Sequence, residues 1–364
     1  MDAFGKLPPN LPGIFASGRG PEYETIWDVG PEVAEPVRGE GEVSRRGWIL
    51  FAAMSVIWGV PYLLIKVADE GVSVPVLVFA RTSVAALLLL PLAARRGQIR
   101  VLLPYWRILV VFALVEIVGP WLLLSNAERH LSSSTSGLLV ATVPIIGVLL
   151  ARLTGDAERI TVVRWTGLLV GLGGVALLAG HLTGGGAWPV VEVLLVATGY
   201  AIGPLIASRK LGDLPGLGLT AVCLGFSAVV IAPAAALSLP HAAPPARVIA
   251  SLAGLAVICT ALAFVLFFKL IAEVGPARAT VITYVNPAVA VALGVAVLGE
   301  SLTPAILMSF ALILSGSVLA TRAGKRPVAA PAEPAQAQAG QAEPAQAIPD
   351  ATAAAPPGEP ARRP

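Results

Sequence analysis

The sequence has few charged residues: Asp, Glu, Lys and Arg make up 13% of its 364 residues, about half the share found in soluble globular proteins. Hydrophobic residues make up 56%, and the mean hydropathy is +0.81. Much of the charge lies near the two ends, so the middle of the chain is too apolar to form a water-facing surface. The net charge is +3, and the basic residues are dispersed rather than clustered. This composition excludes an ordinary soluble enzyme, a nucleic-acid-binding protein and a disordered scaffold.

Cysteine and histidine are also scarce. Cys223 and Cys259 lie deep in apolar runs, and their spacing fits no disulfide framework or metal motif. The sequence contains no Ser/His/Asp set, no HExxH motif and no Walker loop. We therefore predict that the chain is not an enzyme and has no cofactor and no metal site.

Long apolar runs fill the middle of the chain. A helix needs about 20 apolar residues to cross the hydrocarbon core of a bilayer. Runs bounded by charge, Pro or Gly predict ten spans, at residues 48–66, 74–94, 108–127, 134–153, 163–181, 188–207, 216–238, 248–271, 279–298 and 304–321. Because the backbone must be hydrogen-bonded within each span and no period-2 pattern is present, the sequence predicts an all-α protein embedded in lipid.

The distribution of Lys and Arg predicts the orientation. With the N-terminus inside, nearly all Lys and Arg near the spans fall on the inner side, and only Lys66, Arg129 and Arg247 fall on the outer side. By the positive-inside rule we expect a multi-pass protein of the cytoplasmic (inner) membrane with both termini in the cytoplasm.

The two ends of the chain differ from the middle. Residues 1–46 are acidic and contain several Pro and Gly, and residues 322–364 are low-complexity Ala, Pro, Gln and Glu. Neither can bury enough apolar surface to fold, so both are predicted to be disordered cytoplasmic tails. Residues 1–46 also lack the apolar run of a cleaved signal peptide.

An internal repeat divides the middle into residues 47–182 and 183–321. The segments GDAERIT and GESLT are one junction seen twice, and three residue pairs recur at the same interval, Pro61 with Pro204, Lys66 with Arg209, and Pro144 with Pro287. Each half holds five predicted helices. Since five is odd, the second half is inverted in the membrane, as in many secondary transporters.

Two longer segments carry a family resemblance. GPARATVITYVNPAVAVALGVAVLGESLTPAILMSFALILSGSVL resembles the second repeat of the EamA family, in the drug/metabolite transporter superfamily, and SSSTSGLLVATVPIIGVLLARLTGDAERITVVRWTGLLVGLGGVALL resembles its first-repeat counterpart. WGVPYLLIK and Arg81 also fit. The resemblance covers residues 48–321. It implies two inverted five-helix repeats, cytoplasmic ends and a central cavity lined mainly by helices 1–4 and 6–9. It also implies export of amino acids, other small metabolites or drugs.

Glu116 is the first candidate site residue, in the middle of the third predicted span. A charged side chain there costs about 2.5–3.5 kcal/mol, so we expect it to face the bundle interior and to mark a substrate or proton path. Pro120 cannot donate to the Glu116 carbonyl and should kink the helix. The alternative is a permanently protonated glutamate that holds a neighbouring helix by a hydrogen bond. Its repeat counterpart is Cys259, so the feature belongs to one half only.

Prolines form the second candidate set. Four prolines paired across the repeats predict kinks in helices 1, 4, 6 and 9: Pro61, Pro144, Pro204 and Pro287. We interpret these four, together with Pro120 of helix 3, as hinges around a central cavity. The alternative is packing irregularity, because proline is common in membrane helices.

Five further residues are candidates for substrate contact. Asn286 could contact substrate or bond an adjacent helix. Trp58, Tyr62 and Tyr200 lie near the predicted kinks, where they could wall a cavity or pack in the core. Arg81 could snorkel to the outer surface or pair with a carboxylate of the substrate.

Two glutamates are assigned a structural role. Glu158 and Glu300 precede Thr161 and Thr303 at equivalent junctions. We expect each to cap the helix that follows it.

The sequence therefore predicts a secondary transporter that exports a small metabolite by alternating access, with protons as a candidate coupling partner. One alternative is an exchanger or importer of another solute class, such as nucleotide sugars. Phosphates would require several basic groups in the cavity, and only Arg81 is available. The other alternative is a non-transporting membrane interaction protein that acts through its tails. The sequence does not predict an oligomeric state.

Overall fold

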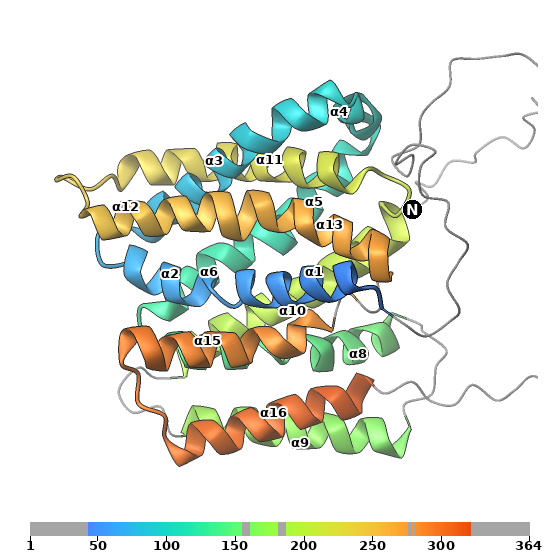
Figure 1. The fold of residues 1–364 in the computed structure, drawn as a ribbon, viewed down its shortest axis with the longest axis vertical. Coiled ribbons are helices and arrows are strands. Elements are labelled where there is room, and N and C mark those ends of the chain that lie inside the picture. Colours follow the sequence, from blue (N-terminus) through green and yellow to red (C-terminus); the bar gives the residue numbers. More distant parts are fainter. Residues whose placement is uncertain (1–42, 155–160, 181–186, 276–278, 280, 322–364) are drawn as a thin grey trace, which may run out of the picture. The chain divides into compact units, whose positions relative to one another are not determined.

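The computed structural model describes residues 43–154, 161–180, 187–275, 279 and 281–321. Most of both predicted tails and Glu158 therefore lie outside the described residues. Within the described ranges the chain forms helices and turns without any strand (Figure 1). The all-α prediction is confirmed.

The first repeat folds into five segments of membrane length. They are α1 with α2 (Arg45–Ile57, Pro61–Ala68), α3 (Val74–Arg95), the series α4, η1, α5, η2 and α6 (Gln98–Leu102, Leu103–Tyr105, Trp106–Ala113, Leu114–Val118, Gly119–Glu128), α7 with α8 (Ser133–Val140, Val143–Leu153), and α9 (Val162–Gly180). The segment η1 is a 3₁₀-helix and η2 is a π-helix.

The second repeat follows the same order. Its segments are α10 (Trp188–Lys210), α11 (Gly216–Leu237), α12 with the π-helix η3 and α13 (Ala246–Ala253, Gly254–Leu262, Ala263–Val274), α15 (Ile282–Leu298) and α16 (Pro304–Thr321). In the part of the chain that the structure describes, nine segments are long and apolar enough to span a membrane, and α15 is a shorter apolar helix. These ten segments coincide with the ten predicted spans.

Helices of the two repeats meet in equivalent pairs. The second segments pack together as α3 with α11, the fourth as α7 with α15, and the fifth as α9 with α16, which lie side by side in Figure 1. The first segment of one repeat packs on the third segment of the other: α1 and α2 contact α13 and α12, and α6 contacts α10. A two-fold relation between the repeats produces this pairing.

Glycines allow the fifth segments to approach closely. A Cβ added at Gly174 of α9 would lie 2.9 Å from Leu312 Cβ, and one added at Gly167 would overlap the backbone of α16 near Gly316. Small residues at such a contact stabilise helix pairs in lipid, where no hydrophobic force drives them together. The Gly-rich stretch of α9 therefore packs inside the chain.

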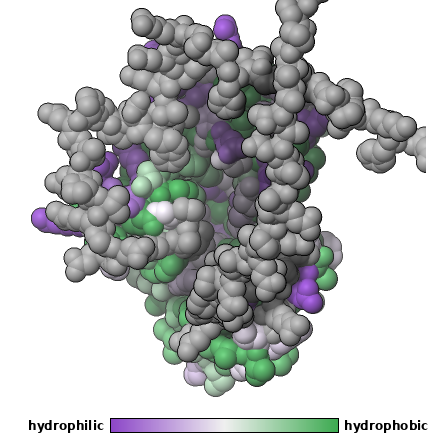
Figure 2. Space-filling model, turned by 90° about the vertical axis from the view of Figure 1, so that its right-hand side faces the viewer, coloured by the Kyte–Doolittle hydropathy of each residue, from purple (hydrophilic) through white to green (hydrophobic). Residues whose placement is uncertain are grey.

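Large apolar side chains cover the outer surface. Leu87 of α3 is 71% exposed and Leu169 of α9 is 66% exposed, and Figure 2 shows hydrophobic residues at the surface of the face it presents. Soluble proteins rarely expose so many large apolar side chains to water. This surface is suited to the hydrocarbon interior of a bilayer.

The paired prolines occupy two different local structures. The chain leaves the helix at residues 58–60 before Pro61 and at residues 141–142 before Pro144. In contrast, α10 and α15 continue through Pro204 and Pro287. The same residue at equivalent positions thus interrupts helices of the first repeat only.

Glu300 does not cap α16, so that prediction was wrong. Its carboxylate accepts hydrogen bonds from the backbone N–H groups of Ser133 (2.7 Å) and Ser134 (3.0 Å), and from the Ser134 hydroxyl. It therefore caps α7 of the other repeat, where unpaired N–H groups and the helix dipole favour an anion. The N-terminus of α16 has its own cap, because the Thr303 hydroxyl accepts from Ile306 N–H at 3.3 Å.

Candidate functional site

Arg81 of α3 lies inside the helix bundle rather than at its surface. It is 7% exposed, its guanidinium carbon lies 3.7 Å from the centroid of the Trp121 ring, and its Nε donates to Thr260 Oγ1 at 2.8 Å. Among the described residues no hydrogen bond or ion pair engages its terminal nitrogens. A buried guanidinium with free terminal N–H groups is suited to bidentate binding of a carboxylate.

The partner of Arg81 comes from a π-helical segment. Thr260 lies in η3, and its hydroxyl donates to Leu255 O at 2.7 Å, which leaves the oxygen lone pairs for Arg81. The first repeat has a π-helix, η2, in the equivalent third segment. Such segments are rare and often lie at functional sites. Pro120 predicted an irregularity in the third segment, where η2 lies, whereas η3 contains no proline and was not predicted from the sequence.

Glu116 lies in η2 and faces α10 of the second repeat. Its Oε2 is buried and has no hydrogen-bond partner in the described part of the chain, and a Cβ added at Gly203 would overlap this oxygen. At Gly199, one turn earlier, an added Cβ would lie 2.5 Å from Val115 O. Two glycines of α10 thus provide the space in which the Glu116 carboxyl group lies between the repeats.

This close approach gives a matched pair of glycine substitutions. Gly203→Ala should lower the stability of the folded chain by about 1–3 kcal/mol, because the new methyl group must displace Glu116 or α10. Gly173→Ala is the control, since beyond its chain neighbours and its own helix backbone no atom of the described residues lies within 4 Å of the added Cβ, and it should be neutral or slightly stabilising. Thermal unfolding of the detergent-purified variants measures both. Equal melting temperatures would contradict the close contact between Gly203 and Glu116.

The two tyrosines lie near Arg81. Tyr62 of α2 is buried, and Tyr200 of α10 packs against the main core. Both interact electrostatically with Arg81, as does Glu128. We call Arg81, Trp121, Tyr62, Tyr200 and Glu116 the central cluster. It draws on three helices of the first repeat, the π-helix η2 and one helix of the second repeat.

Two other candidates lie in packing contacts. Trp58 packs on Phe267, with ring centroids 4.7 Å apart, and on Phe264 at 6.1 Å. With its amide NH2 turned toward the nearby carbonyls, Asn286 donates to Ser55 O at 3.1 Å and to Ile282 O at 2.9 Å. Trp58, in the turn after α1, thus contacts α13, and Asn286 of α15 bonds to α1. These contacts match the packing alternative for both residues.

Glu128, which the sequence analysis missed, ends α6 and is fully buried. Neither carboxyl oxygen has a hydrogen-bond partner within the described ranges. Lys66 donates instead to the backbone carbonyls of Glu128 and Leu131, the latter at 2.8 Å, and so stabilises the C-terminal end of α6. In the sequence Glu128 closes an apolar run beside Arg129, which is where a solvated interfacial charge is expected.

Asp69 follows α2 at the same end of the bundle. Its Oδ1 lies 3.7 Å from Arg129 Nε. Burial raises the pKa of Asp69 to about 6, although the charges of Arg129 and Lys66 lower it. The folded chain therefore keeps a proton that the unfolded chain, with the ordinary value of 3.8, releases.

This raised pKa predicts a pH-dependent stability. Below about pH 4 both states hold the proton, between pH 4 and 6 stability falls as pH rises, and above pH 6 the loss is complete, on the order of 2 kcal/mol. Asp69→Asn should remove this part of the decline and raise the melting temperature above pH 7. Melting temperatures from pH 4 to 8 measure it. An identical pH profile in the variant would contradict the burial of the Asp69 carboxylate.

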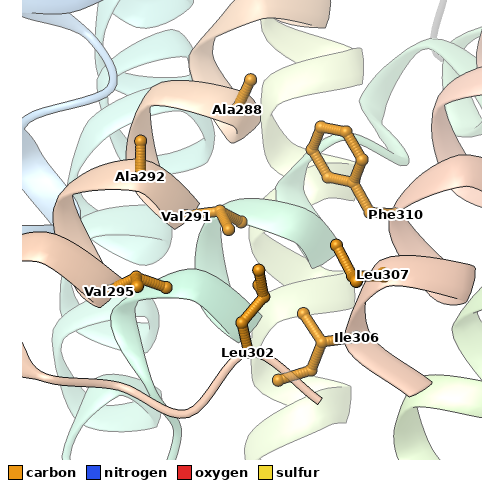
Figure 3. A pocket seen from close by; sticks show the side chains of 8 residues that line it. All are labelled: Ala288, Val291, Ala292, Val295, Leu302, Ile306, Leu307 and Phe310. Atoms are coloured by element: carbon orange, nitrogen blue, oxygen red, sulfur yellow. The ribbon is translucent and has the colours of Figure 1, made fainter. Parts of the chain in front are cut away.

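An apolar groove of about 260 Å³ lies apart from these groups. It runs between α15 and α16 and is lined by apolar side chains such as Val291, Leu302 and Phe310 (Figure 3). It contains no titratable side chain, so it is not the candidate site. The described ranges also contain no group of three or more His, Cys, Asp or Glu side chains that could hold a metal ion.

Comparisons with known proteins agree with this architecture. The sequence model of the EamA-like transporter family matches residues 45–180 and 187–322. The chain is 29% identical over 293 residues to the "Uncharacterized inner membrane transporter YedA" of Escherichia coli strain K12, covering 77% of this chain and 93% of that protein. It is also 29% identical over 293 residues to a "Probable terminal-alkyne amino-acid exporter" of Streptantibioticus cattleyicolor, covering 77% and 95%.

A solved crystal structure has the same fold. It aligns with a TM-score of 0.55 and 21% sequence identity, and covers 76% of this chain and 96% of the solved chain. At this identity the likeness concerns the fold alone.

Proposed function

This chain belongs to the EamA-like transporter family, and from that premise we propose that it exports a small metabolite, an amino acid or a related compound, by alternating access. The chain is a multi-pass inner-membrane transporter, as its apolar helices and the relative YedA indicate. The name of the Streptantibioticus relative supports an amino-acid-like solute. Equivalent helices of the two repeats run through the membrane in opposite directions, so inward-open and outward-open states have similar energies.

One observation carries the proposed site: the buried guanidinium of Arg81, whose terminal N–H groups have no partner among the residues that the structure describes. In an apolar bundle this charge attracts an anion strongly, and a carboxylate fits its fork. Thr260 and the Trp121 ring fix the orientation of the guanidinium. Tyr62 and Tyr200 add hydroxyl groups that can hydrogen-bond a solute.

Glu116 is the proposed coupling residue. Its carboxyl group lies between η2 and Gly203 of α10, where the repeats meet. Movement of α10 relative to η2 would change the exposure of this group and so its affinity for a proton. The helix interruptions before Pro61 and Pro144 are the proposed hinges of the first repeat. In the second repeat, Pro204 and Pro287 each remove one backbone hydrogen bond from a continuous helix, and we propose that the helices bend there.

The orientation is also part of the proposal. The bias of Lys and Arg supports an orientation with both termini in the cytoplasm. The end of the bundle that holds Lys66, Asp69, Glu128 and Glu300 then faces outward. We call it the outer end.

The proposed function is tested by an untargeted comparison of solutes in cells that express the chain and in cells that do not. Expressing cells should retain less of one class of carboxylate-bearing solute and release more of it to the medium. Expression of Arg81→Lys should abolish the difference. Identical solute profiles in all three strains would contradict export.

A further inference from the structure

Glu128 has the properties of a group that must be neutral in this conformation. It is 0% exposed, and both of its carboxyl oxygens lack a hydrogen-bond partner among the described residues. The buried carboxylate of Glu192 differs, since its Oε1 accepts from Asn126 Nδ2 at 2.8 Å. Glu300 also differs, because α7 donates to both of its oxygens. An ionised carboxylate without donors in an apolar protein interior is strongly unfavourable.

The charged groups around Glu128 have mixed signs. Asp69, Lys66, Glu300 and Arg81 act on it electrostatically, in decreasing order, and Tyr62 and Tyr200 also interact with it electrostatically. Arg129 is its neighbour in sequence and is turned toward Asp69 and Val72 O. Lys66 is held by backbone carbonyls, and no ion pair between Lys66 and Glu128 forms within the described ranges. The surrounding cations therefore do not replace a proton on Glu128.

Contacts between the repeats close the bundle around this residue. Glu300 of the second repeat caps α7 of the first. Ser73 donates to Ser238 O at 3.0 Å, and Arg247 pairs with Glu70. Each contact joins a group of the first repeat to one of the second. Separation of the repeats at this end would break all three contacts and admit water to Glu128.

We propose that Glu128 is a proton-binding gate residue: the outer end closes when Glu128 carries a proton and opens when Glu128 releases that proton to outside water. On opening, the carboxyl O–H bond breaks and its proton binds to a water molecule outside. The resulting carboxylate is then hydrated. The repeat counterpart of Glu128 is Ile271, so the equivalent position of the second repeat carries no carboxyl group. External protons would thus act on one gate only. This inference rests on the proposed orientation and transport function.

The experiment measures opening directly, without substrate. A reporter cysteine replaces Ser136, which is 0% exposed in α7, in a chain whose own cysteines are changed by Cys223→Ala and Cys259→Ala. A membrane-impermeant maleimide is added outside at pH 5.5 to 8. The thiol itself reacts up to about tenfold faster per pH unit, because only the thiolate attacks the maleimide. After division by the rate of a free thiol at the same pH, labelling of the chain with native Glu128 should still rise with pH, by up to about a further tenfold per unit where opening releases one proton.

Two variants in the same reporter chain separate titration from structure. Glu128→Gln resembles the protonated acid, so labelling should stay low and should not vary beyond the intrinsic pH response of the thiol. Glu192→Gln is the matched control, since Glu192 is 3% exposed, and it should keep the full rise. A full rise in Glu128→Gln, or its loss in Glu192→Gln, would overturn the proposal.

A second measurement needs no variant at Glu128. A hydrophobic carbodiimide reacts with protonated carboxyl groups in apolar surroundings. Mass spectrometry should find the adduct on Glu128 of the unmodified chain at pH 5.5 and much less at pH 8. Equal labelling at both values would overturn the gate. Because neither assay measures solute movement, the gate can fail while export holds, and export can fail while the gate holds.

Discussion

Arg81→Lys is expected to lower solute efflux from reconstituted vesicles by about 100-fold. Lysine keeps the positive charge but loses the planar fork, the stacking on Trp121 and the geometry of the bond to Thr260. Loss of a charge-assisted pair of hydrogen bonds corresponds to about 3 kcal/mol, or roughly two orders of magnitude in affinity. Efflux is measured with the solute found by the cellular comparison.

The control for this substitution is another arginine. Arg247 is exposed and pairs with Glu70 at the surface, and Arg247→Lys keeps that charge pair, so efflux should stay within about twofold. Size-exclusion profiles in detergent should match for both variants and the unmodified chain. Normal efflux by a folded Arg81→Lys variant would exclude Arg81 from the substrate site.

Glu116→Gln is expected to abolish export driven by a pH gradient. The amide has the shape of the protonated acid and cannot release a proton, so the coupled cycle stops after binding. The loss of driven efflux should be at least about 100-fold, while exchange of labelled for unlabelled solute at equal pH continues, as that step needs no net proton movement.

Glu192→Gln is the comparison for this prediction as well, because Glu192 is buried and bonded to Asn126. Its driven efflux should remain near that of the unmodified chain. Driven efflux at the normal rate in Glu116→Gln would assign proton coupling to another group. Loss of both driven efflux and exchange would instead indicate a binding role for Glu116.

Local sequence features predicted most of the fold. The ten spans follow from apolar runs whose length is set by the bilayer, and the repeat is visible in the paired prolines and in the junctions GDAERIT and GESLT. The pairing of α3 with α11 and of α9 with α16 follows from the two-fold relation once the repeat is recognised. These features depend on the composition of a segment, which a single sequence displays.

The candidate site was only partly predictable, because its properties depend on distant partners. Arg81 allowed two interpretations until Trp121 and Thr260 were located beside it. Glu300 was correctly assigned to a cap but to the wrong helix, since its donors in α7 lie 166 and more residues away. Glu128 resembled an interfacial charge, and it is distinguished only by its burial and by the lack of hydrogen-bond partners for its carboxyl group among the described residues.

The account depends most on two repeats of opposite orientation that enclose the central cluster. Thr154 and Ser301 test this directly, because they follow α8 and α15, the fourth segments of the two repeats, and both are exposed. Single cysteines at these positions, in a chain without Cys223 and Cys259, are labelled in intact cells by an impermeant maleimide before and after lysis. The account predicts that Ser301→Cys is labelled from outside and Thr154→Cys only after lysis. Labelling of both positions from the same side would contradict it.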